Sequence, residues 1–378
     1  MRADVRSSLV AVAAIFAQSW YAVEAKPLHA GLDYHRYLQE RDQVAERLEQ
    51  WRKSAPGQEA AKNNWGFDGE SRSGEAAEDQ LQRFAMTEQL IEKVRALNPE
   101  ANFSTSSPFT LMTDEEFNKY VGQSFAAGEA LMNEATANMT EHKFEADRDG
   151  ETSIDWSQSG CVGRVKDQGQ CGSCYAFGTV AAAESAYCIR NNRQLVHFSD
   201  QQVTSCSEHG CQGGWPQNSL NYIMRNGLCT ENAYSYRSGT TKQPGQCQAN
   251  QCQHVNLNIR QIVHVRQSEQ ALENAVRGRP VSVGLAAGNS AWKQYKGGVL
   301  STCTSTQLDH VVLVYGFTPE YWMVKNSWGT SWGENGFLKM KRGVSHRGSW
   351  GGGGWGGMGG GGSNGLCGMY SLMTYPDI

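Results

Sequence analysis

The sequence lacks the features that would indicate a nucleic-acid partner or a membrane span. Its formal net charge is −4 over 378 residues, so no excess of lysine and arginine provides a positive field for nucleic acid. No segment is apolar for long enough to cross a bilayer as a helix. We therefore expect no nucleic-acid partner and no membrane span.

Cysteine is absent from residues 26–150, whereas all eleven cysteines lie between Cys161 and Cys367. This absence excludes disulfides from the first part of the chain and predicts a boundary near residue 150. Because eleven is an odd number, at least one thiol stays outside any bridge if the others pair.

The first 25 residues, MRADVRSSLVAVAAIFAQSWYAVEA, have the pattern of a secretory signal peptide. Arg2 and Arg6 precede a short apolar run, and the small residues Val23 and Ala25 stand where a signal peptidase cleaves. A disordered N-terminus is the alternative. The high cysteine count agrees with the signal peptide, since an oxidising compartment permits disulfides. We expect the secretory pathway, with the product extracellular or in a lysosome or vacuole.

Hydrophobic periodicity predicts a helical part followed by a part rich in strands. Amphipathic helices are expected over 34–53 and 78–98, with a loop over 54–77 between them. An alanine-rich helix with a buried face is expected over 174–190. Short strands are expected over 310–317, 321–325 and 336–342. The glycine- and tryptophan-rich run 348–363 has the composition of a flexible surface loop.

The stretch DQGQCGSCYAFG contains a Cys-x-x-Cys pair, Cys171 and Cys174, that admits three interpretations. A redox dithiol would sit in a strand–helix alternation, which is missing here. A zinc site needs a second ligand pair, and Cys206 and Cys211 come without an intracellular context. The third interpretation makes Cys171 structural and Cys174 a nucleophile at a helix N-terminus, where the helix dipole stabilises a thiolate. Such a nucleophile needs a histidine and a group that orients it, and His310 and Asn326 are candidates.

Seven stretches together resemble the papain-like cysteine proteases, in family order from about residue 151 to the C-terminus. They are IDW, VKDQGQCGSCYAFG, CQGGWP, RPVSVGL, LDH, VKNSWGTSWGENGF and NGLCGMYSLMTYP. The resemblance implies an α+β fold with a helical left domain, an antiparallel β-barrel right domain and the active site in the cleft between them. It implies a cysteine-type endopeptidase made as a zymogen, with no cofactor and no metal.

The resemblance also assigns roles to individual residues. Cys174 is similar to the nucleophile, His310 to its general base and acid, and Asn326 to the group that orients the imidazole. Gln168 and the Cys174 backbone N–H correspond to the oxyanion donors. Trp328 corresponds to the indole that shields the His–Asn pair. Taken singly, each of these residues would be an ordinary structural side chain.

Substrate-binding residues follow from the same resemblance. Gly213 and Gly214 correspond to the edge that binds an extended substrate backbone. The pocket for the side chain two positions before the cleaved bond is expected to be lined by Trp215, Pro216, Gly284, Leu308 and Leu372. Its apolar floor would not compensate the desolvation of a buried cation, so we expect bulky apolar or aromatic side chains there.

The resemblance also implies the domain boundaries and the disulfides. We expect a signal peptide over 1–25, a divergent inhibitory propeptide over 26–150, and a peptidase domain over 151–378. The peptidase domain would have a helical half at about 151–258 and a β half at about 259–378. The implied bridges are Cys171–Cys211, Cys206–Cys247, Cys303–Cys367, Cys161–Cys188 and Cys229–Cys252.

The expected partners are polypeptide substrates, the chain's own propeptide as an intramolecular inhibitor, and protein inhibitors of cysteine proteases. Asn102 and Asn138 begin glycosylation sequons. No His-His insertion lies between Cys211 and Cys252, so the occluding loop of cathepsin B-like relatives is not visible. This favours an endopeptidase over a dipeptidyl carboxypeptidase. Two other classes compete with the peptidase: a catalytically silent binding protein of the same fold, and a disulfide-rich adhesive or carbohydrate-binding module. Retention of Cys174, His310 and Gln168 argues against the silent binding protein. The adhesive module leaves the Cys–His–Asn set unexplained.

Overall fold

The structure is a computed structural model that describes residues 26–66, 73–123, 140–141, 151–207, 209–344 and 364–378. The predicted signal peptide, the sequon at Asn138 and the glycine-rich run 348–363 lie outside the described residues. Of the helices in the described part of the chain, none is long and apolar enough to cross a membrane.

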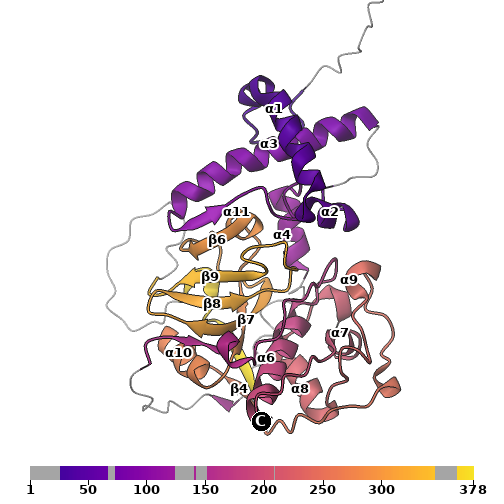
Figure 1. Cartoon of the computed structure of the whole chain (residues 1–378), viewed down its shortest axis with the longest axis vertical. Coiled ribbons are helices and arrows are strands. Elements are labelled where there is room, and N and C mark those ends of the chain that lie inside the picture. Colours follow the sequence, from indigo (N-terminus) through magenta and orange to yellow (C-terminus); the bar gives the residue numbers. More distant parts are fainter. Residues whose placement is uncertain (1–25, 67–72, 124–139, 142–150, 208, 345–363) are drawn as a thin grey trace, which may run out of the picture.

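The N-terminal part is helical, as its periodicity predicts, and its first three helices lie at the end of the molecule opposite the C-terminus (Figure 1). Asp33 caps the first helix by accepting a hydrogen bond from the Arg36 backbone N–H. Not every leucine of the predicted amphipathic helices is buried, since Leu38 and Leu97 are 47% and 61% exposed. The elements of this part are α1 (Tyr34–Lys53), α2 (Ala55–Lys62), α3 (Ser73–Leu97), β1 (Ala101–Phe103), α4 (Asp114–Gly122) and β2 (Thr140–Glu141).

Helix α2 corrects the expected loop over 54–77. Ser54 accepts a hydrogen bond from the Gly57 backbone N–H, and Pro56 lies in the first turn. Both are helix-starting signals, because the serine oxygen satisfies an unpaired N–H and proline lacks one. The glycine and asparagine content of the stretch concealed these signals.

The part after residue 150 begins with helices that surround the long, buried α6. Its elements up to residue 251 are β3 (Ile154–Asp155), η1 (Trp156–Ser159), α6 (Cys174–Arg190), α7 (Asp200–Cys206), η2 (Gly210–Gln212), α8 (Pro216–Asn226), α9 (Ser238–Thr241) and η3 (Ala249–Gln251). Helix α6 covers the residues that periodicity predicts. It packs on strand β7 (His310–Phe317) of the sheet, so the helical and β halves meet along α6.

Most of the sheet follows in sequence. The remaining elements are β4 (Gln261–His264), α10 (Glu269–Gly278), β5 (Val281–Leu285), α11 (Ser290–Gln294), β6 (Tyr295–Leu300), β7 (His310–Phe317), β8 (Tyr321–Lys325), β9 (Phe337–Lys341), η4 (Leu366–Gly368) and β10 (Leu372–Asp377). Strands β7, β8 and β9 agree closely with the three predicted strands.

The sheet differs from the closed antiparallel barrel that the family resemblance implied. Its described strands follow the open order β1-β6-β9-β8-β7-β5-β10-β4-β2, with β3 paired to β7. Two pairs, β6 with β9 and β2 with β4, are parallel. The N-terminal part supplies both terminal strands, since β1 pairs with β6 and β2 pairs with β4. Both sheet edges are therefore covered by segments that precede residue 150, which satisfies their backbone hydrogen-bonding groups.

One apolar cluster runs without interruption from the N-terminal helices into the sheet. It joins Tyr37 of α1, Phe84 of α3 and Phe109 to Trp292 and Trp328 of the β half. The helical half has a separate cluster around α6 that includes Cys174, Phe198 and Leu220. The N-terminal part thus shares its core with the β half.

Ten cysteines form five disulfides, and the pairs are those that the resemblance implied. They are Cys161–Cys188, Cys171–Cys211, Cys206–Cys247, Cys229–Cys252 and Cys303–Cys367. Cys174 belongs to none of these bridges and is buried.

Candidate active site

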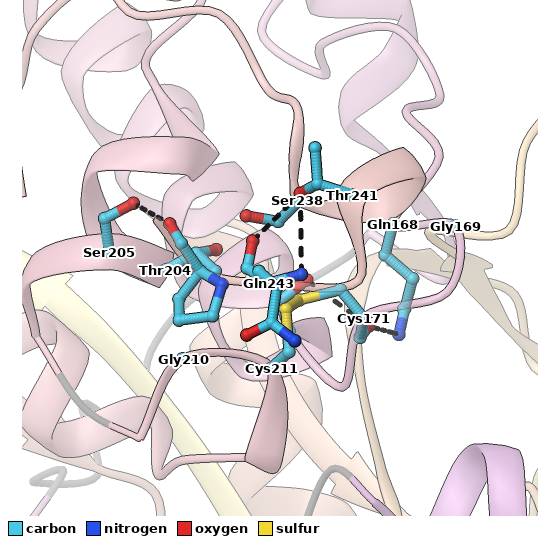
Figure 2. The surroundings of a disulfide bond; sticks show 12 residues. Gln168, Gly169, Cys171, Thr204, Ser205, Gly210, Cys211, Ser238, Thr241 and Gln243 are labelled. Carbon is cyan, nitrogen blue, oxygen red and sulfur yellow. Dashed lines mark hydrogen bonds between the residues drawn. A yellow bond between two sulfur atoms is a disulfide. The ribbon is translucent and has the colours of Figure 1, made fainter. Parts of the chain in front are cut away.

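Cys174 is the first residue of α6, so its thiol lies at the positive end of a helix dipole. The preceding loop is fixed by the Cys171–Cys211 disulfide and by a hydrogen bond of 3.0 Å from the Gly172 N–H to the Cys211 carbonyl. Figure 2 shows this disulfide beside Gln168. The arrangement holds the Cys174 sulfur at a fixed place at the helix N-terminus.

His310 and Asn326 are brought together by the pairing of β7 with β8. His310 begins β7 and Asn326 directly follows β8. The His310 Nε2 atom lies 2.7 Å from Asn326 Oδ1. Because the amide oxygen only accepts, Nε2 carries the proton and donates it. Nδ1 is buried with no hydrogen-bond partner among the described residues, so it is the nitrogen left to take a proton.

The imidazole is shielded from water on one face. The Trp328 indole stacks on the His310 ring with a centroid distance of 4.6 Å, and both side chains are buried. Burial lowers the pKa of His310 to about 4, although the hydrogen bond to Asn326 raises it in part. His310 is therefore neutral above about pH 4 in this state.

Gln168 lies in the loop before Cys171, and three of its hydrogen bonds are to Cys171 and Ser327. Its Nε2 donates to the Cys171 carbonyl at 3.0 Å, and its Oε1 accepts from Ser327 Oγ at 2.7 Å. The Gln168 backbone N–H also donates to the Ser327 carbonyl at 2.9 Å. An amide nitrogen has two hydrogens, so one remains for a developing oxyanion.

Sequence reasoning missed Ser327. Its hydroxyl binds Gln168, and its backbone N–H donates to Asn326 Oδ1 at 2.8 Å. One residue therefore orients two of the predicted site residues. Its position directly after Asn326, in a stretch already singled out, was the available signal.

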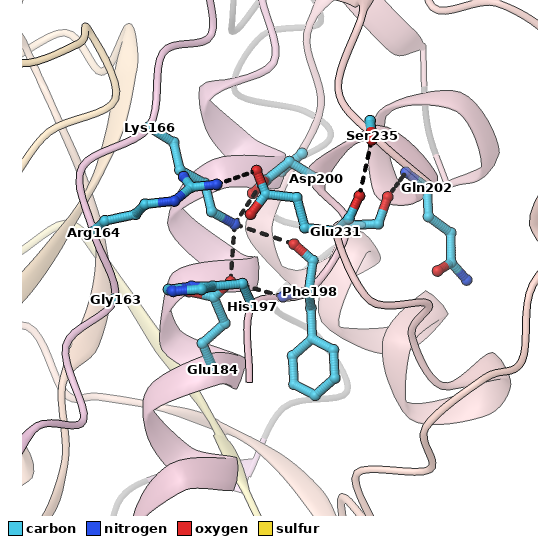
Figure 3. A network of polar contacts seen from close by, with 12 residues as sticks. Gly163, Arg164, Lys166, Glu184, His197, Phe198, Asp200, Gln202, Glu231 and Ser235 are labelled. Atoms are coloured by element: carbon cyan, nitrogen blue, oxygen red, sulfur yellow. Dashed lines mark hydrogen bonds and ion pairs between the residues drawn. The ribbon is translucent and has the colours of Figure 1, made fainter. Parts of the chain in front are cut away.

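A buried charge cluster lies behind the site and was also missed. Lys166 Nζ donates to Glu184 at 2.8 Å and to Asp200 at 2.6 Å (Figure 3). Burial alone would raise the pKa of Glu184, but the charges of Lys166 and Lys325, together with hydrogen bonds from Lys166 and His197, outweigh burial and lower that pKa. Lys325 Nζ is also buried and donates to the Gly163 carbonyl, and burial lowers the pKa of Lys325 to about 8. Lys166 and Lys325 each lie within two residues of a predicted site residue, so the cluster fixes the two chain segments that carry Gln168 and Asn326.

The predicted pocket residues come from both halves. Gly284 of β5 pairs with Leu372 of β10, and a Cβ at position 284 would lie 3.0 Å from Leu372 Cδ2. Trp215 and Pro216 start α8, and Leu308 is half-buried just before β7. Gly213 has φ +100°, which favours glycine, and both Gly213 and Gly214 are buried.

A cavity of about 1040 Å³ lies beside these residues, between the N-terminal part and the helical half. Its lining includes Trp65, Gln123, Cys211 and Gln212. Gly284, Leu308 and Leu372 are outside that lining, so the cavity is separate from the predicted side-chain pocket.

The N-terminal part covers the candidate site. Phe109 and Phe117 meet the Trp328 indole edge-on, with centroid distances of 5.3 and 5.6 Å. Gln123 follows α4 and lies against Gly172, where an added Cβ would be 3.1 Å from the Gln123 backbone. The N-terminal part therefore lies over the Trp328 indole and against Gly172 in this state.

Known proteins are similar to this chain in both sequence and fold. The sequence profile described as "Papain family cysteine protease" matches residues 151–375. Cysteine endopeptidase Rep1 of Oryza sativa subsp. japonica is 39% identical over 245 residues, which cover 62% of this chain and 60% of that protein. Cysteine endopeptidase RepA of the same organism is 34% identical over 306 residues, which cover 76% of this chain and 75% of that protein.

A solved structure extends the likeness to the N-terminal part. The proform of Amb a 11, a cysteine protease of ragweed pollen, matches with a TM-score of 0.71 and 25% identity. The match covers 92% of this chain and 98% of that one. The chain therefore belongs to the papain family of cysteine proteases.

Proposed function

We propose that the chain is a cysteine endopeptidase made as a zymogen, in which Cys174 and His310 carry the chemistry. The observation that supports this most strongly is the His310–Asn326 contact of 2.7 Å beneath Trp328. It fixes the tautomer whose Nδ1 accepts a proton, as a base for a thiol requires.

In the first half-reaction, the Cys174 sulfur attacks the peptide carbonyl carbon. Its proton goes to His310 Nδ1, and the carbonyl oxygen becomes an oxyanion that accepts from Gln168 Nε2 and the Cys174 N–H. His310 then gives the proton to the amide nitrogen, the carbon–nitrogen bond breaks, and the amine leaves. A thioester on Cys174 remains.

In the second half-reaction, water attacks the thioester carbonyl carbon, and His310 takes a proton from that water. The carbon–sulfur bond breaks, the carboxylic product forms, and the sulfur regains its proton. Asn326 keeps the imidazole in one orientation through both half-reactions.

We propose that residues 26–150 are the inhibitory propeptide. Phe109 and Phe117 cover the indole above His310, and Gln123 lies on the loop that leads to Cys174. Lys293 of α11, 1% exposed, forms an ion pair with Asp114 of α4 and donates to the Met112 carbonyl at 3.0 Å. The same docked segment therefore blocks both substrate and water.

Acid is expected to weaken the propeptide. Burial alone would raise the pKa of Glu78, but hydrogen bonds from Tyr37, Gln82 and Arg41 outweigh it and lower the pKa. A carboxylate with a lowered pKa stabilises the fold above its ordinary pKa of 4.5 and loses that contribution as the pH falls through the lowered value. Loosening of the propeptide helices is thus expected below about pH 4.5.

The proposed specificity is for bulky apolar side chains two residues before the cleaved bond. Leu372 is 2% exposed and its apolar side chain lies against Gly284. A substrate cation buried at this place in the pocket would therefore lack a counter-charge. A panel of fluorogenic peptides tests this: Leu or Phe at that position should be cleaved at least about tenfold faster than Arg. Faster cleavage of the Arg peptide would contradict the proposal.

We further propose that the protein follows the secretory pathway and ends outside the cell or in a lysosome or vacuole. Five disulfides support an oxidising route. Its proposed partners are polypeptide substrates and protein inhibitors of cysteine proteases. Asn102 of β1 is exposed, so its sequon is accessible to a glycan.

The test of the function is covalent labelling. The acid-treated protein is incubated with a thiol-directed peptidyl epoxide and the adduct is mapped; it should lie on Cys174. Cys174→Ala should abolish labelling and lower peptidase activity by on the order of 10⁴-fold or more. Activity that survives this substitution, or an adduct elsewhere, would instead favour a catalytically silent binding protein.

A further inference from the structure

Tyr236 lies outside every stretch that carried the resemblance, yet its hydroxyl joins two parts of the candidate oxyanion site. The Tyr236 oxygen is 2.8 Å from the Gln168 carbonyl oxygen and 2.8 Å from Ser173 Oγ. Gln168 supplies one proposed oxyanion donor, and Ser173 directly precedes Cys174, whose N–H supplies the other. No other described side chain is hydrogen-bonded to both residues.

The direction of these hydrogen bonds follows from the groups involved. A carbonyl oxygen can only accept, so the phenol donates its one proton to Gln168. Ser173 must then donate to the Tyr236 oxygen. The order is Ser173 O–H to Tyr236 O–H to the Gln168 carbonyl, and each bond polarises the next. Burial raises the pKa of Tyr236, so the phenol keeps the proton that this chain of bonds needs.

Tyr236 is itself held on two sides. Its ring meets Phe177 of α6 edge-on, with a centroid distance of 4.8 Å. The next two backbone N–H groups, of Arg237 and Ser238, both donate to Gln201 Oε1, at 2.7 and 3.0 Å. The hydroxyl is therefore presented from a fixed ring.

The loop after Tyr236 lies directly against the oxyanion loop. The Gln170 N–H donates to the Gly239 carbonyl at 2.9 Å, and a Cβ at Gly239 would lie 2.7 Å from the Gln168 carbonyl oxygen. A Cβ at Gly169, which has φ +55°, would lie 2.8 Å from the Gly239 Cα atom. Two glycines thus allow the backbones to approach closely enough for the phenol to reach Gln168.

We propose that Tyr236 is a positioning residue of the oxyanion hole, holding Gln168 in register with the turn that carries Cys174. The inference rests on the proposed peptidase function and adds a residue to it. Tyr236 touches no reacting atom, so its effect passes through Gln168. Loss of the hydroxyl should weaken stabilisation of the oxyanion and leave the Cys174–His310 pair unchanged.

The test compares Tyr236→Phe with Tyr234→Phe in enzyme that is made as the full chain and then processed. Tyr234 is a matched control, because its hydroxyl also donates to a backbone carbonyl, that of Gln246 at 3.2 Å, away from the site. Tyr236→Phe should lower kcat for amide substrates by on the order of 10-fold with KM within about twofold. Alkylation of Cys174 by iodoacetamide, which forms no oxyanion, should stay within about twofold of the unmodified enzyme.

A double-mutant cycle decides whether the effect passes through Gln168. In a Gln168→Ala background, Tyr236→Phe should cost less than about twofold. An equal loss in both backgrounds, or equal rates for Tyr236→Phe and Tyr234→Phe, would overturn the inference. If Tyr236→Phe fails to fold, Ser173→Ala cuts the same chain of hydrogen bonds and should show the same split between hydrolysis and alkylation. Absence of epoxide labelling in the unmodified protein would count against the peptidase proposal instead.

Discussion

The N-terminal part and the part after residue 150 use charge in opposite ways. In the first, α1 and α3 are joined by ion pairs at the surface, such as Arg36–Glu92 and Arg47–Glu88, whose side chains are 23–54% exposed. In the second, Lys166, Glu184 and Asp200 form a cluster in which no side chain is more than 9% exposed. Five disulfides add covalent links to the second part, whereas residues 1–150 contain no cysteine.

The difference matches two proposed fates. Exposed carboxylate pairs contribute little each and are lost in acid, which suits a segment that must be released. Buried ion clusters fail badly when one partner is removed, and the disulfides link the second part through bonds that acid does not break. The shared apolar cluster under Trp328 holds the two parts together until the first one loosens.

The largest expected effect comes from breaking the buried cluster. Lys166→Met leaves Glu184 and Asp200 buried without their cation, so it should lower the free energy of unfolding of the peptidase part by roughly 3–5 kcal/mol. Lys339→Met, which removes a half-exposed pair with Glu334, is the control and should cost less than about 1 kcal/mol. Chemical denaturation of the processed enzyme measures both, and equal losses would remove the contrast between the two kinds of ion pair.

A smaller effect is expected at the boundary between the two parts. Glu59 of α2 lies against the enzyme near Gly329 and Asp167, and burial raises the pKa of Glu59 to about 7. A carboxyl with a raised pKa opposes docking above that pH, and the penalty disappears as the pH falls below it. Glu59→Gln removes this penalty, so the N-terminal part should cover Cys174 more tightly at pH 8. Epoxide labelling of Cys174 in the zymogen should then be about tenfold slower at pH 8 and little changed at pH 5.

The control for this boundary is Glu49→Gln, at an exposed position of α1, which should change labelling by less than about twofold at either pH. If Glu59→Gln speeds labelling at pH 8, the carboxylate stabilises docking and the assigned sign is wrong.

The smallest effect is expected inside the propeptide. Arg47→Gln removes the pair with Glu88 and should destabilise the α1–α3 contact by about 0.3–1 kcal/mol. Labelling of Cys174 in the zymogen should rise by less than about fivefold, and the rise should shrink in 1 M salt because salt screens exposed charges. The exposed Lys93→Gln on α3 serves as control, and a salt-independent effect of Arg47→Gln would place the pair among buried interactions.

Local pattern was sufficient for many elements of the fold. The expected helix over 174–190 and the strands over 310–317 and 321–325 have the bounds of α6, β7 and β8. Their periodicity and composition agree with their burial, so local and tertiary preferences coincide. Helix α2 was missed because its starting signals stand within a loop-like composition. The open sheet with edges covered by β1 and β2 depends on contacts between distant segments, which no local pattern encodes.

The residues of the candidate site also divide into those that the sequence indicates and those that only the structure reveals. Cys174, His310, Asn326 and Gln168 could be singled out because their residue types and order resemble a known family. Ser327 offered only its position after Asn326 as a signal, and Tyr236 offered none. Both hydroxyls act through partners that folding brings within 2.8 Å.

By itself, the sequence determined the family, the helix that presents Cys174 and the one cysteine of eleven left outside the bridges. Tertiary structure decided which side chains orient the site and how the N-terminal part covers it. The physical reason is range: periodicity and capping act over a few residues, whereas His310 meets Asn326, Phe109 meets Trp328 and Tyr236 meets Gln168 only after the chain has buried a common core.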